Sequence, residues 1–539
     1  MRSRGIWTGA FAGLAMTLAA CGSGGEQGND ESGVAQQNEE SDMTVATTAY
    51  GKVRGDIEDG VVVFKGIPYG ASTAGENRFM PPKPPANWTD VRDALKFGDQ
   101  CPQTEPPPTA AFASWGREVG QSEDCLVLNV WTPAVDDQKR PVMVWFHGGG
   151  FAVFDGSAPV YDSPKMVKRG DVVVVTLNHR LNLFGYMYLG GLGGEKYANS
   201  ANLGQQDLVA ALKWVRDNIA NFGGDPNNVM IFGESGGGAK VSNVLAMPSA
   251  KGLFNKAAIE SGPGLTAQTV EQANELTRKF LANLNLTEKD VDKLQTLPAS
   301  NLLDAMKKMT GGMPIAGFGP VVDGTVLPRQ PFTPDAPSVS ADVPVIVGYN
   351  ATETTVLFPT PGLFTLDWDS LKNALAPQMP GKDVDTVIAD MRKLMPDASP
   401  SDIYFIVTTE RGMGAGSYLL ASRKAALGAA PAYVYRLGWK TPVEDGKLGS
   451  PHALDLPMVF DTVGKSASMI GDGTEEAQKV ADTMSAFWVS FARDGDPNGP
   501  GLPEWPAYDD AKKATMVFNV ESQAENDPVG DIRAIVLDK

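Results

Sequence analysis

Short, unbroken runs of apolar and largely β-branched residues recur along this chain, and they constrain its fold more than any other feature. They occupy residues 142–146, 172–177, 229–232, 343–347 and 432–435. Such runs are typical of strands that are buried on both faces, as in a parallel sheet. Helical patterns lie between them, with apolar residues at i, i+3, i+4 and i+7 in residues 207–219 and a second such stretch at 475–491. The alternation predicts an α/β fold with a mostly parallel central sheet and crossover helices, and with excursions such as residues 270–310.

One of these runs leads into Gly233-Glu234-Ser235-Gly236-Gly237, and a helical stretch follows. This strand–turn–helix context is what a G-x-S-x-G nucleophile elbow requires, because the serine must take a strained backbone that exposes its hydroxyl. The helix behind Ser235 would direct backbone N–H groups toward developing negative charge. The motif alone is weak in a chain with 59 glycines, and a glycine-rich turn with a solvated serine is the alternative.

A second glycine run, His147-Gly148-Gly149-Gly150-Phe151, directly follows the apolar run at 142–146. Hydrolases of this architecture use such a loop, after an early strand, to expose backbone N–H groups to an oxyanion. A phosphate-binding loop is the alternative, but no Gly-Lys-Ser/Thr follows and no acid is placed for a dinucleotide. We therefore interpret this segment as an oxyanion-binding loop.

The chain has three histidines, and one of them must be the base if Ser235 is a nucleophile. Hydrolases with this elbow carry their catalytic triad in the order Ser, Asp or Glu, His. His147 belongs to the glycine loop, which it is expected to orient, and His179 precedes the serine. Only His452 follows Ser235, so His452 is the predicted base.

The acid of a triad is expected between Ser235 and His452, at the end of a strand. Glu353 meets this condition, because the segment 348–353 closes the apolar run at 343–347. An exposed loop acid is the alternative reading of Glu353. Asp455 is only three residues from His452 and is too local to reach the correct ring nitrogen.

The first residues are interpreted as an export signal (residues 1–20). Two arginines precede an uncharged stretch that is short for a bilayer-spanning helix, which needs about 20 apolar residues. The ending Leu18-Ala19-Ala20-Cys21 resembles a bacterial lipoprotein box, in which Cys21 becomes the lipidated first residue. An ordinary signal with an incidental cysteine is the alternative. Residues 21–43 are predicted to be a flexible acidic tether. We expect an exported protein on the periplasmic or surface side, held to the membrane only by this lipid anchor.

Export also changes the interpretation of the other cysteines. With Cys21 lipidated, Cys101 and Cys125 are the only possible internal pair, and an oxidising compartment favours a disulfide.

From residue 44 to 539 no low-complexity linker and no repeat divides the chain. A formal net charge of −18 disfavours a nucleic-acid binder that works by neutralising phosphates.

The motifs together resemble the type-B carboxylesterase and cholinesterase family of α/β-hydrolases. Residues 222–226 leading to the 233–237 elbow fit the serine signature of that family, and residues 123–133 fit its second signature. The likeness extends from Gly51 to about Trp505, which is nearly the whole mature chain. It implies one α/β-hydrolase domain over residues 44–539, with large helical insertions.

The resemblance implies a serine carboxylic-ester hydrolase that forms an acyl-Ser235 intermediate and needs no metal or organic cofactor. It implies Ser235 as nucleophile, Glu353 as acid, His452 as base, and Gly149, Gly150 and Gly236 as oxyanion donors. Glu234 and Ser261 would support the triad, and Cys101–Cys125 would be a family disulfide.

The expected partner is a small-molecule ester, and its identity stays open. Trp115, Phe151 and Phe318 are candidate substrate-contacting residues. Trp115 has the offset from Cys125 of the cholinesterase tryptophan that stacks on quaternary ammonium; we favour a loop aromatic that lines an apolar gorge. A specialised esterase for choline-type or bulky natural-product esters is one alternative, and a non-catalytic surface binding protein is another.

Overall fold

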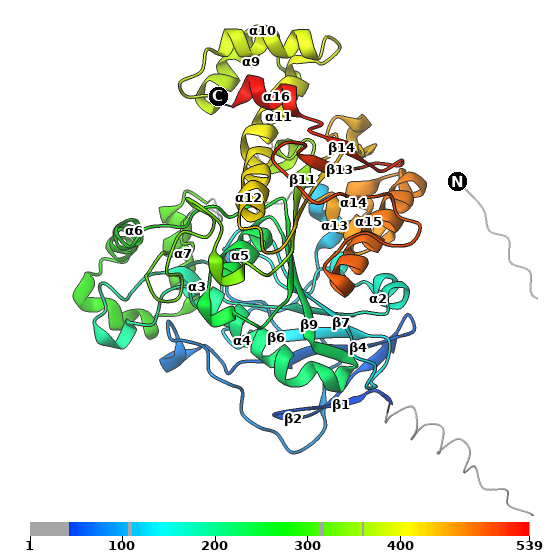
Figure 1. The fold of residues 1–539 in the computed structure, drawn as a ribbon. Coiled ribbons are helices and arrows are strands. Elements are labelled where there is room, and N and C mark those ends of the chain that lie inside the picture. The colour runs from blue at the N-terminus through cyan, green and yellow to red at the C-terminus, as the bar shows by residue number, and fades with distance from the viewer. Residues whose placement is uncertain (1–42, 106–109, 313–316, 358–359, 538–539) are drawn as a thin grey trace, which may run out of the picture. The chain divides into compact units, whose positions relative to one another are not determined.

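The computed structural model describes residues 43–105, 110–312, 317–357 and 360–537. The chain divides into two compact units, Met1–Met43 and Thr44–Lys539. The predicted signal, Cys21 and all of the tether but Met43 lie outside the described residues. The larger unit contains the sheets and helices described below (Figure 1). Among the described residues, no helix combines the length and apolar character needed to cross a membrane.

An eleven-stranded sheet forms the centre of the larger unit (Figure 1). Across the sheet the strands are β14 (Gln523–Asn526), β13 (Ala514–Phe518), β12 (Ala432–Leu437), β11 (Val345–Asn350), β10 (Lys256–Glu260), β9 (Gly224–Glu234), β7 (Arg140–Phe146), β8 (Val173–Leu177), β6 (Val127–Thr132), β4 (Val61–Pro68) and β3 (Asp56–Glu58). Neighbours from β8 to β13 are parallel, and the remaining pairs are antiparallel. A second, three-stranded sheet holds β1 (Val45–Thr48), β2 (Gly51–Arg54) and β5 (Arg92–Asp93).

Helices cover both faces of the large sheet, and successive strand residues supply the two cores in turn. In β7, Val142, Val144 and Phe146 enter one hydrophobic core, and Met143 and Trp145 enter the other. The first core packs against α4 (Leu203–Asn218), α5 (Gly236–Leu245) and α12 (Ala415–Ala426). The second packs against α2 (Pro164–Gly170), α13 (Asp455–Val459) and α15 (Thr474–Asp494). A strand buried on both faces needs apolar residues at every position, which is why these strands are unbroken apolar runs.

The remaining helices form insertions with cores of their own. One core joins α3 (Asn182–Tyr186), α6 (Val270–Asn283) and α7 (Ala299–Met309). Another joins α9 (Trp368–Leu375), α10 (Val384–Leu394), α11 (Pro400–Thr409) and α16 (Gly530–Val536), which gather beyond one end of α12 in Figure 1. Two short helices, α8 (Thr354–Leu357) and α14 (Ala467–Ile470), complete the α-helices of the described residues, which also contain short 3₁₀ helices and a π-helix at Glu410–Gly414.

The structure confirms the predicted fold class. The five apolar runs correspond to β7, β8, β9, β11 and β12, and the two helical patterns to α4 and α15. Cys101 and Cys125 form the expected disulfide. No apolar run marks β10 in the sequence, because its residues Lys-Ala-Ala-Ile-Glu carry a charge at each end and little β-branching. Because the central strands are parallel, the loops after β7, β9, β10, β11 and β12 meet at one edge of the sheet.

Candidate active site

Ser235 lies in a sharp turn between β9 and α5. Its backbone has φ 58° and ψ −123°, a conformation that non-glycine residues rarely adopt. A β-carbon on Gly236 would overlap the carbonyl of Gly150, and one on Gly262 would overlap the carbonyl oxygen of Ser235. The glycines therefore let three chain segments approach closely, as the elbow prediction requires.

The glycine loop after β7 packs directly against this turn. A β-carbon on Gly148 would lie 3.2 Å from the backbone oxygen of Glu234 and 3.6 Å from Cβ of Ser235. Gly149 and Gly150 have φ of 78° and 61°, which favours glycine at both positions. Within the described part of the chain, the N–H groups of Gly149 and Gly150 donate to no protein acceptor. Two unpaired donors thus lie beside the serine, an arrangement that can bind an oxyanion.

Glu353 is fully buried just beyond the end of β11 and has a complete set of partners. Its Oε1 accepts hydrogen bonds of 2.6 Å from Ser261 Oγ and of 2.6 Å from the backbone N–H of Asn350. Its Oε2 lies 2.5 Å from Nδ1 of His452. Glu353 is therefore not an exposed loop acid, and Ser261 contacts it as expected.

His452 lies in a loop between β12 and α13, and contacts with the loop after β11 fix its position. The side chain of Asn350 donates to the carbonyl oxygen of Pro451 at 2.8 Å, and Thr352 Oγ1 accepts from the N–H of Ser450 at 2.7 Å. Because Nδ1 of His452 contacts Glu353, Nε2 lies on the opposite side of the ring. Nε2 is 3.1 Å from Oε1 of Glu234, the residue before Ser235.

Ser235 is half-buried, and within the described residues its hydroxyl forms no hydrogen bond. The structure therefore brings Glu353, His452 and the neighbour of Ser235 into contact, and it leaves the serine hydroxyl free. Catalytic hydrogen bonds are often long or absent without substrate, so this spacing is compatible with a serine–histidine pair.

The charges around His452 are buried and mutually dependent. Burial raises the pKa of Glu234 to about 8, and the charges of Asp455 and Glu353 act in the same direction. Burial alone would lower the pKa of His452, but Glu234 and Glu353 outweigh it and raise that pKa to about 9. The site therefore holds a proton more tightly than isolated side chains would.

Asp455 is buried near Glu353 and His452, but no hydrogen bond joins it to the imidazole in the described residues. Its Oδ2 accepts from the hydroxyl of Tyr435 at 2.7 Å, and its Oδ1 accepts from Asn350 Nδ2 at 3.2 Å. Burial, together with the charge of Glu353, raises the pKa of Asp455. Asp455 thus braces the histidine loop through Asn350, consistent with its exclusion as the triad acid.

His147 and His179 form a buried stacked pair, with ring centroids 4.7 Å apart. Burial lowers the pKa of both rings well below the usual value, so both are neutral. His147 Nδ1 lies 3.1 Å from the carbonyl oxygen of Gly148, in contact with the loop that it was expected to orient. The sequence pattern did not single out Lys240, whose Nζ donates to the carbonyl oxygen of His147 in the same loop. The available signal was a lysine one turn into a helix with a glycine-rich start.

The three candidate substrate residues lie in different surroundings. Phe151, at the end of the glycine loop, packs edge-to-face on Tyr186 at 5.1 Å. Phe318 is buried in the same helical core and packs edge-to-face on Phe280 at 5.7 Å. Trp115 ends a 3₁₀ helix (Ala110–Trp115), and its indole N–H donates to Ser466 Oγ at 3.0 Å. No described contact joins Trp115 to Ser235.

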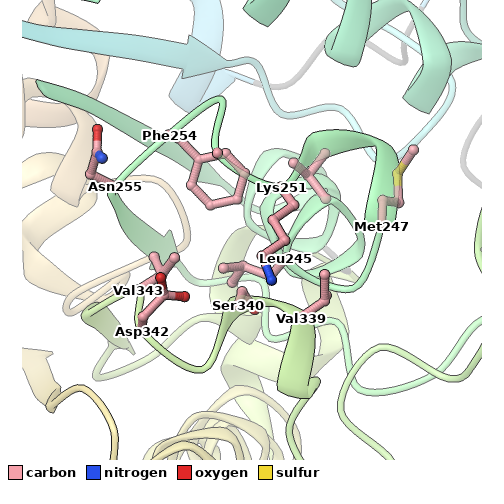
Figure 2. Close-up of a pocket in the computed structure, with 11 residues that line it drawn as sticks. Leu245, Met247, Lys251, Phe254, Asn255, Val339, Ser340, Asp342 and Val343 are labelled. Atoms are coloured by element: carbon pink, nitrogen blue, oxygen red, sulfur yellow. The ribbon is translucent and has the colours of Figure 1, made fainter. Parts of the chain in front are cut away.

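A cavity of about 200 Å³ lies at the far end of α5 from Ser235. Its walls include Phe254, Lys251 and Asp342, as Figure 2 shows. The cavity contains none of the predicted site residues. Among the described residues, no cluster of three or more His, Cys, Asp or Glu side chains could hold a metal ion.

Comparison with known proteins gives a consistent result. A family model described as "Carboxylesterase family" matches residues 42–530. Para-nitrobenzyl esterase of Bacillus subtilis is 38% identical over 498 residues, which cover 91% of this chain and 97% of the relative. Liver carboxylesterase of Sus scrofa is 34% identical, with 89% and 90% covered. The crystal structure of carboxylesterase Est55 from Geobacillus stearothermophilus matches with a TM-score of 0.80 and 39% identity, covering 92% of this chain and all of that one.

Proposed function

The chain belongs to the carboxylesterase family, and from this premise we propose that it hydrolyses carboxylic esters through a covalent acyl intermediate on Ser235. The observation that carries the proposal is the orientation of His452. Glu353 accepts the Nδ1 proton at 2.5 Å, so Nε2 is the nitrogen left to act as a base. That nitrogen faces the residue immediately before Ser235.

In the first half of the proposed reaction, Ser235 Oγ attacks the ester carbonyl carbon and its proton passes to His452 Nε2. The carbonyl oxygen becomes an oxyanion, which the N–H groups of Gly149, Gly150 and Gly236 stabilise. When the tetrahedral intermediate collapses, the carbon–oxygen bond to the alcohol breaks and His452 returns the proton to that oxygen.

In the second half, water attacks the acyl carbon while His452 takes one of its protons. Collapse of this second intermediate breaks the bond to Ser235 Oγ, which recovers its proton from His452 and releases the carboxylic acid. Glu353 keeps its contact with Nδ1 and stabilises the imidazolium form of His452. Its three close donors support this role.

A fluorophosphonate probe, which reacts with activated serines, tests the mechanism. We expect stoichiometric labelling that mass spectrometry assigns to Ser235, and loss of both labelling and hydrolysis in Ser235→Ala. Ser485→Ala, in α15, serves as a matched buried-serine control and keeps both activities. Labelling that survives in Ser235→Ala would refute the mechanism, and an inactive wild type would favour a binding protein.

We propose that neutral esters with an aromatic group are the substrates, in line with the name of the para-nitrobenzyl esterase relative. Phe151, at the end of the glycine loop, supports an apolar, aromatic lining beside the reacting carbonyl. A panel of para-nitrobenzyl, phenyl and choline esters, assayed on wild type and Trp115→Ala, tests this. We expect high kcat/KM on the neutral esters and similar small changes on all esters in the variant. A selective loss on choline esters would instead indicate a cation site at Trp115.

We also propose that residues 1–20 direct export and that Cys21 carries the lipid anchor. The Leu18-Ala19-Ala20-Cys21 sequence supports this, with the acidic tether behind it. Expression of the full chain in the presence of labelled fatty acid should label the wild type and leave Cys21→Ala unlabelled and released from membranes. A labelled Cys21→Ala, or an unlabelled wild type, would contradict the anchor.

A further inference from the structure

Lys240 is a fully buried lysine at the back of the oxyanion loop, which we define as residues 147–151. It lies in α5, five positions after Ser235, and has no exposed surface. Its Nζ donates to the carbonyl oxygens of His147 at 2.7 Å and of Gly148 at 3.3 Å. Among the described residues, no carboxylate pairs with it. Both polar contacts of Lys240 therefore go to the backbone of one loop.

These two contacts determine which way the peptide groups of the loop point. In a trans peptide, the C=O and the following N–H lie on opposite sides of the plane. When Lys240 holds the carbonyl oxygen of Gly148, the N–H of Gly149 must point away from the lysine. A β-carbon on Gly148 would lie 3.2 Å from the backbone oxygen of Glu234 and 3.6 Å from Cβ of Ser235, so this part of the loop lies beside the turn that carries Ser235. Lys240 therefore orients a peptide group next to the nucleophile.

The neighbouring donor is oriented by a different contact. The carbonyl oxygen of Gly149 accepts from the N–H groups of Ala152 and Val153, each at 3.2 Å. This local turn orients the N–H of Gly150 without help from Lys240. His147 Nδ1 reinforces the lysine, because it lies 3.1 Å from the same Gly148 oxygen. The two oxyanion donors of the loop therefore depend on separate supports.

A buried amine is costly to maintain, which makes its placement informative. Desolvation lowers the pKa of Lys240 well below its usual value, and an apolar side chain would avoid that cost. The stacked rings of His147 and His179 enclose the site and bring no compensating charge, because both are neutral. The favourable contacts of Lys240 are its two backbone hydrogen bonds and a position 5.9 Å from the ring centroid of Phe151, and all three partners belong to the oxyanion loop.

We propose that Lys240 is a positioning residue for ester hydrolysis, which holds the Gly148 carbonyl so that the Gly149 N–H faces the oxyanion. The inference rests on the proposed function of Ser235. It predicts that Lys240 contributes to binding of the tetrahedral state and not to binding of the planar ester.

The chain offers a matched control in Lys424 of α12. Lys424 is 2% exposed, and its Nζ donates to the carbonyl oxygens of Ser340 and Ala341 at 2.9 and 2.7 Å. Ser340 lines the cavity at the far end of α5 (Figure 2). Both lysines are almost fully buried and donate to two successive backbone carbonyl oxygens, but Lys424 contacts a different part of the chain and has the charge of Asp342 nearby.

The test compares wild type, Lys240→Met and Lys424→Met in kcat, KM, Tm and affinity for a trifluoromethyl ketone, which forms a tetrahedral adduct with the serine. We expect Lys240→Met to lower kcat about 10- to 100-fold and to change KM by less than about twofold. This decrease in kcat should not exceed the decrease caused by removal of a whole oxyanion donor. Affinity for the ketone should fall by a similar factor in Lys240→Met. In Lys424→Met, the affinity for the ketone should stay at the wild-type value. A Lys240→Met enzyme with wild-type kcat or ketone affinity would overturn the proposal.

Two further measurements separate this result from folding and from the proposed function. If Lys240→Met does not fold, Lys240→Gln keeps a donor that reaches one carbonyl and should show a smaller loss of ketone affinity. A crystal structure of the wild type with the ketone should retain both Lys240 contacts; a displaced Nζ would overturn the role. Failure of the wild type to react at Ser235 would refute the proposed function itself, whereas a reactive wild type with unchanged Lys240 variants refutes only the positioning.

Discussion

The carboxyl oxygen Oε1 of Glu234 lies 3.1 Å from Nε2 of His452, on the side of the ring opposite Glu353. Both side chains are almost completely buried. The imidazole therefore lies between two carboxyl groups, one on each nitrogen. A protonated ring is stabilised from both sides, and in the proposed mechanism His452 must lose that proton before it can accept one from Ser235.

The pH dependence of catalysis should report this arrangement. With the pKa of His452 raised to about 9, kcat/KM should fall as pH drops below that value. Glu234→Gln removes one of the raising charges, so the acid limb of the kcat/KM profile should move to lower pH. A profile of kcat/KM from pH 5 to 10 measures the shift.

A buried acid whose charge does not act on His452 provides the control for this shift. Glu410 is fully buried and pairs with Tyr349, and its charge is not among those that act on His452. Glu410→Gln should leave the acid limb where it is. An unshifted limb in Glu234→Gln would show that its carboxyl does not act on the base.

Stability should also change with pH through the same pair. His452 has a folded pKa of about 9, above its ordinary 6.5, so its contribution is present below 6.5 and is lost as pH rises through 9. Glu234, with a folded pKa of about 8, likewise binds its proton more tightly in the folded state, so stability falls from pH 4.5 to 8. Melting curves at pH 7 and 9.5 should show a decline in Tm that is smaller in Glu234→Gln. An equal decline in both proteins would contradict the two raised pKa values.

Ser261 should affect catalysis through Glu353. Its hydroxyl donates to Glu353 Oε1 at 2.6 Å, and removal leaves a buried carboxylate with one fewer donor. We expect Ser261→Ala to lower kcat about tenfold, the value of roughly one hydrogen bond to a charged group. Single-substrate kinetics measure this, with Ser485→Ala as the buried-serine control. An unchanged kcat would show that Asn350 alone is enough to hold the acid.

Gly236 should not tolerate a side chain. A β-carbon there would overlap the carbonyl of Gly150, and the oxyanion loop would have to move away from Ser235. Gly236→Ala is expected to lower kcat about 100-fold or more. Gly116→Ala, where a β-carbon meets nothing within 4 Å, should behave as wild type in the same assay. Comparable kcat for the two variants would argue against the close approach of these loops.

The disulfide should contribute to stability and not to chemistry. Cys101 and Cys125 are buried and close a loop with a sequence separation of 24. In the chain-entropy model, a loop of this length is worth about 3–4 kcal/mol. The double variant Cys101→Ala/Cys125→Ala should have a Tm several degrees lower than the wild type and an unchanged kcat at 25 °C. Reduction of the wild type by dithiothreitol should lower Tm by the same amount. A variant with unchanged Tm would show that the loop is already ordered without the bond.

Much of the fold could be predicted because buried parallel strands leave a local signature. Unbroken apolar runs marked β7, β8, β9, β11 and β12, since a strand covered on both faces has no polar position. The strand β10 lacked that signature, because Lys256 and Glu260 at its ends are polar and find partners only in the folded protein.

The sequence by itself was enough to predict which residues form the candidate site, because triad order and a single histidine after Ser235 left few choices. It could not determine that Nε2 of His452 faces Glu234, that Asn350 joins the acid to the histidine loop, or that Lys240 reaches the carbonyl oxygens of the oxyanion loop. Those contacts join segments from different strands and helices, and no local pattern encodes the direction of a side chain across a sheet edge. Only the packing of β7, β9, β11 and α5 at one edge brings these groups within hydrogen-bonding distance and sets the pKa values on which the chemistry depends.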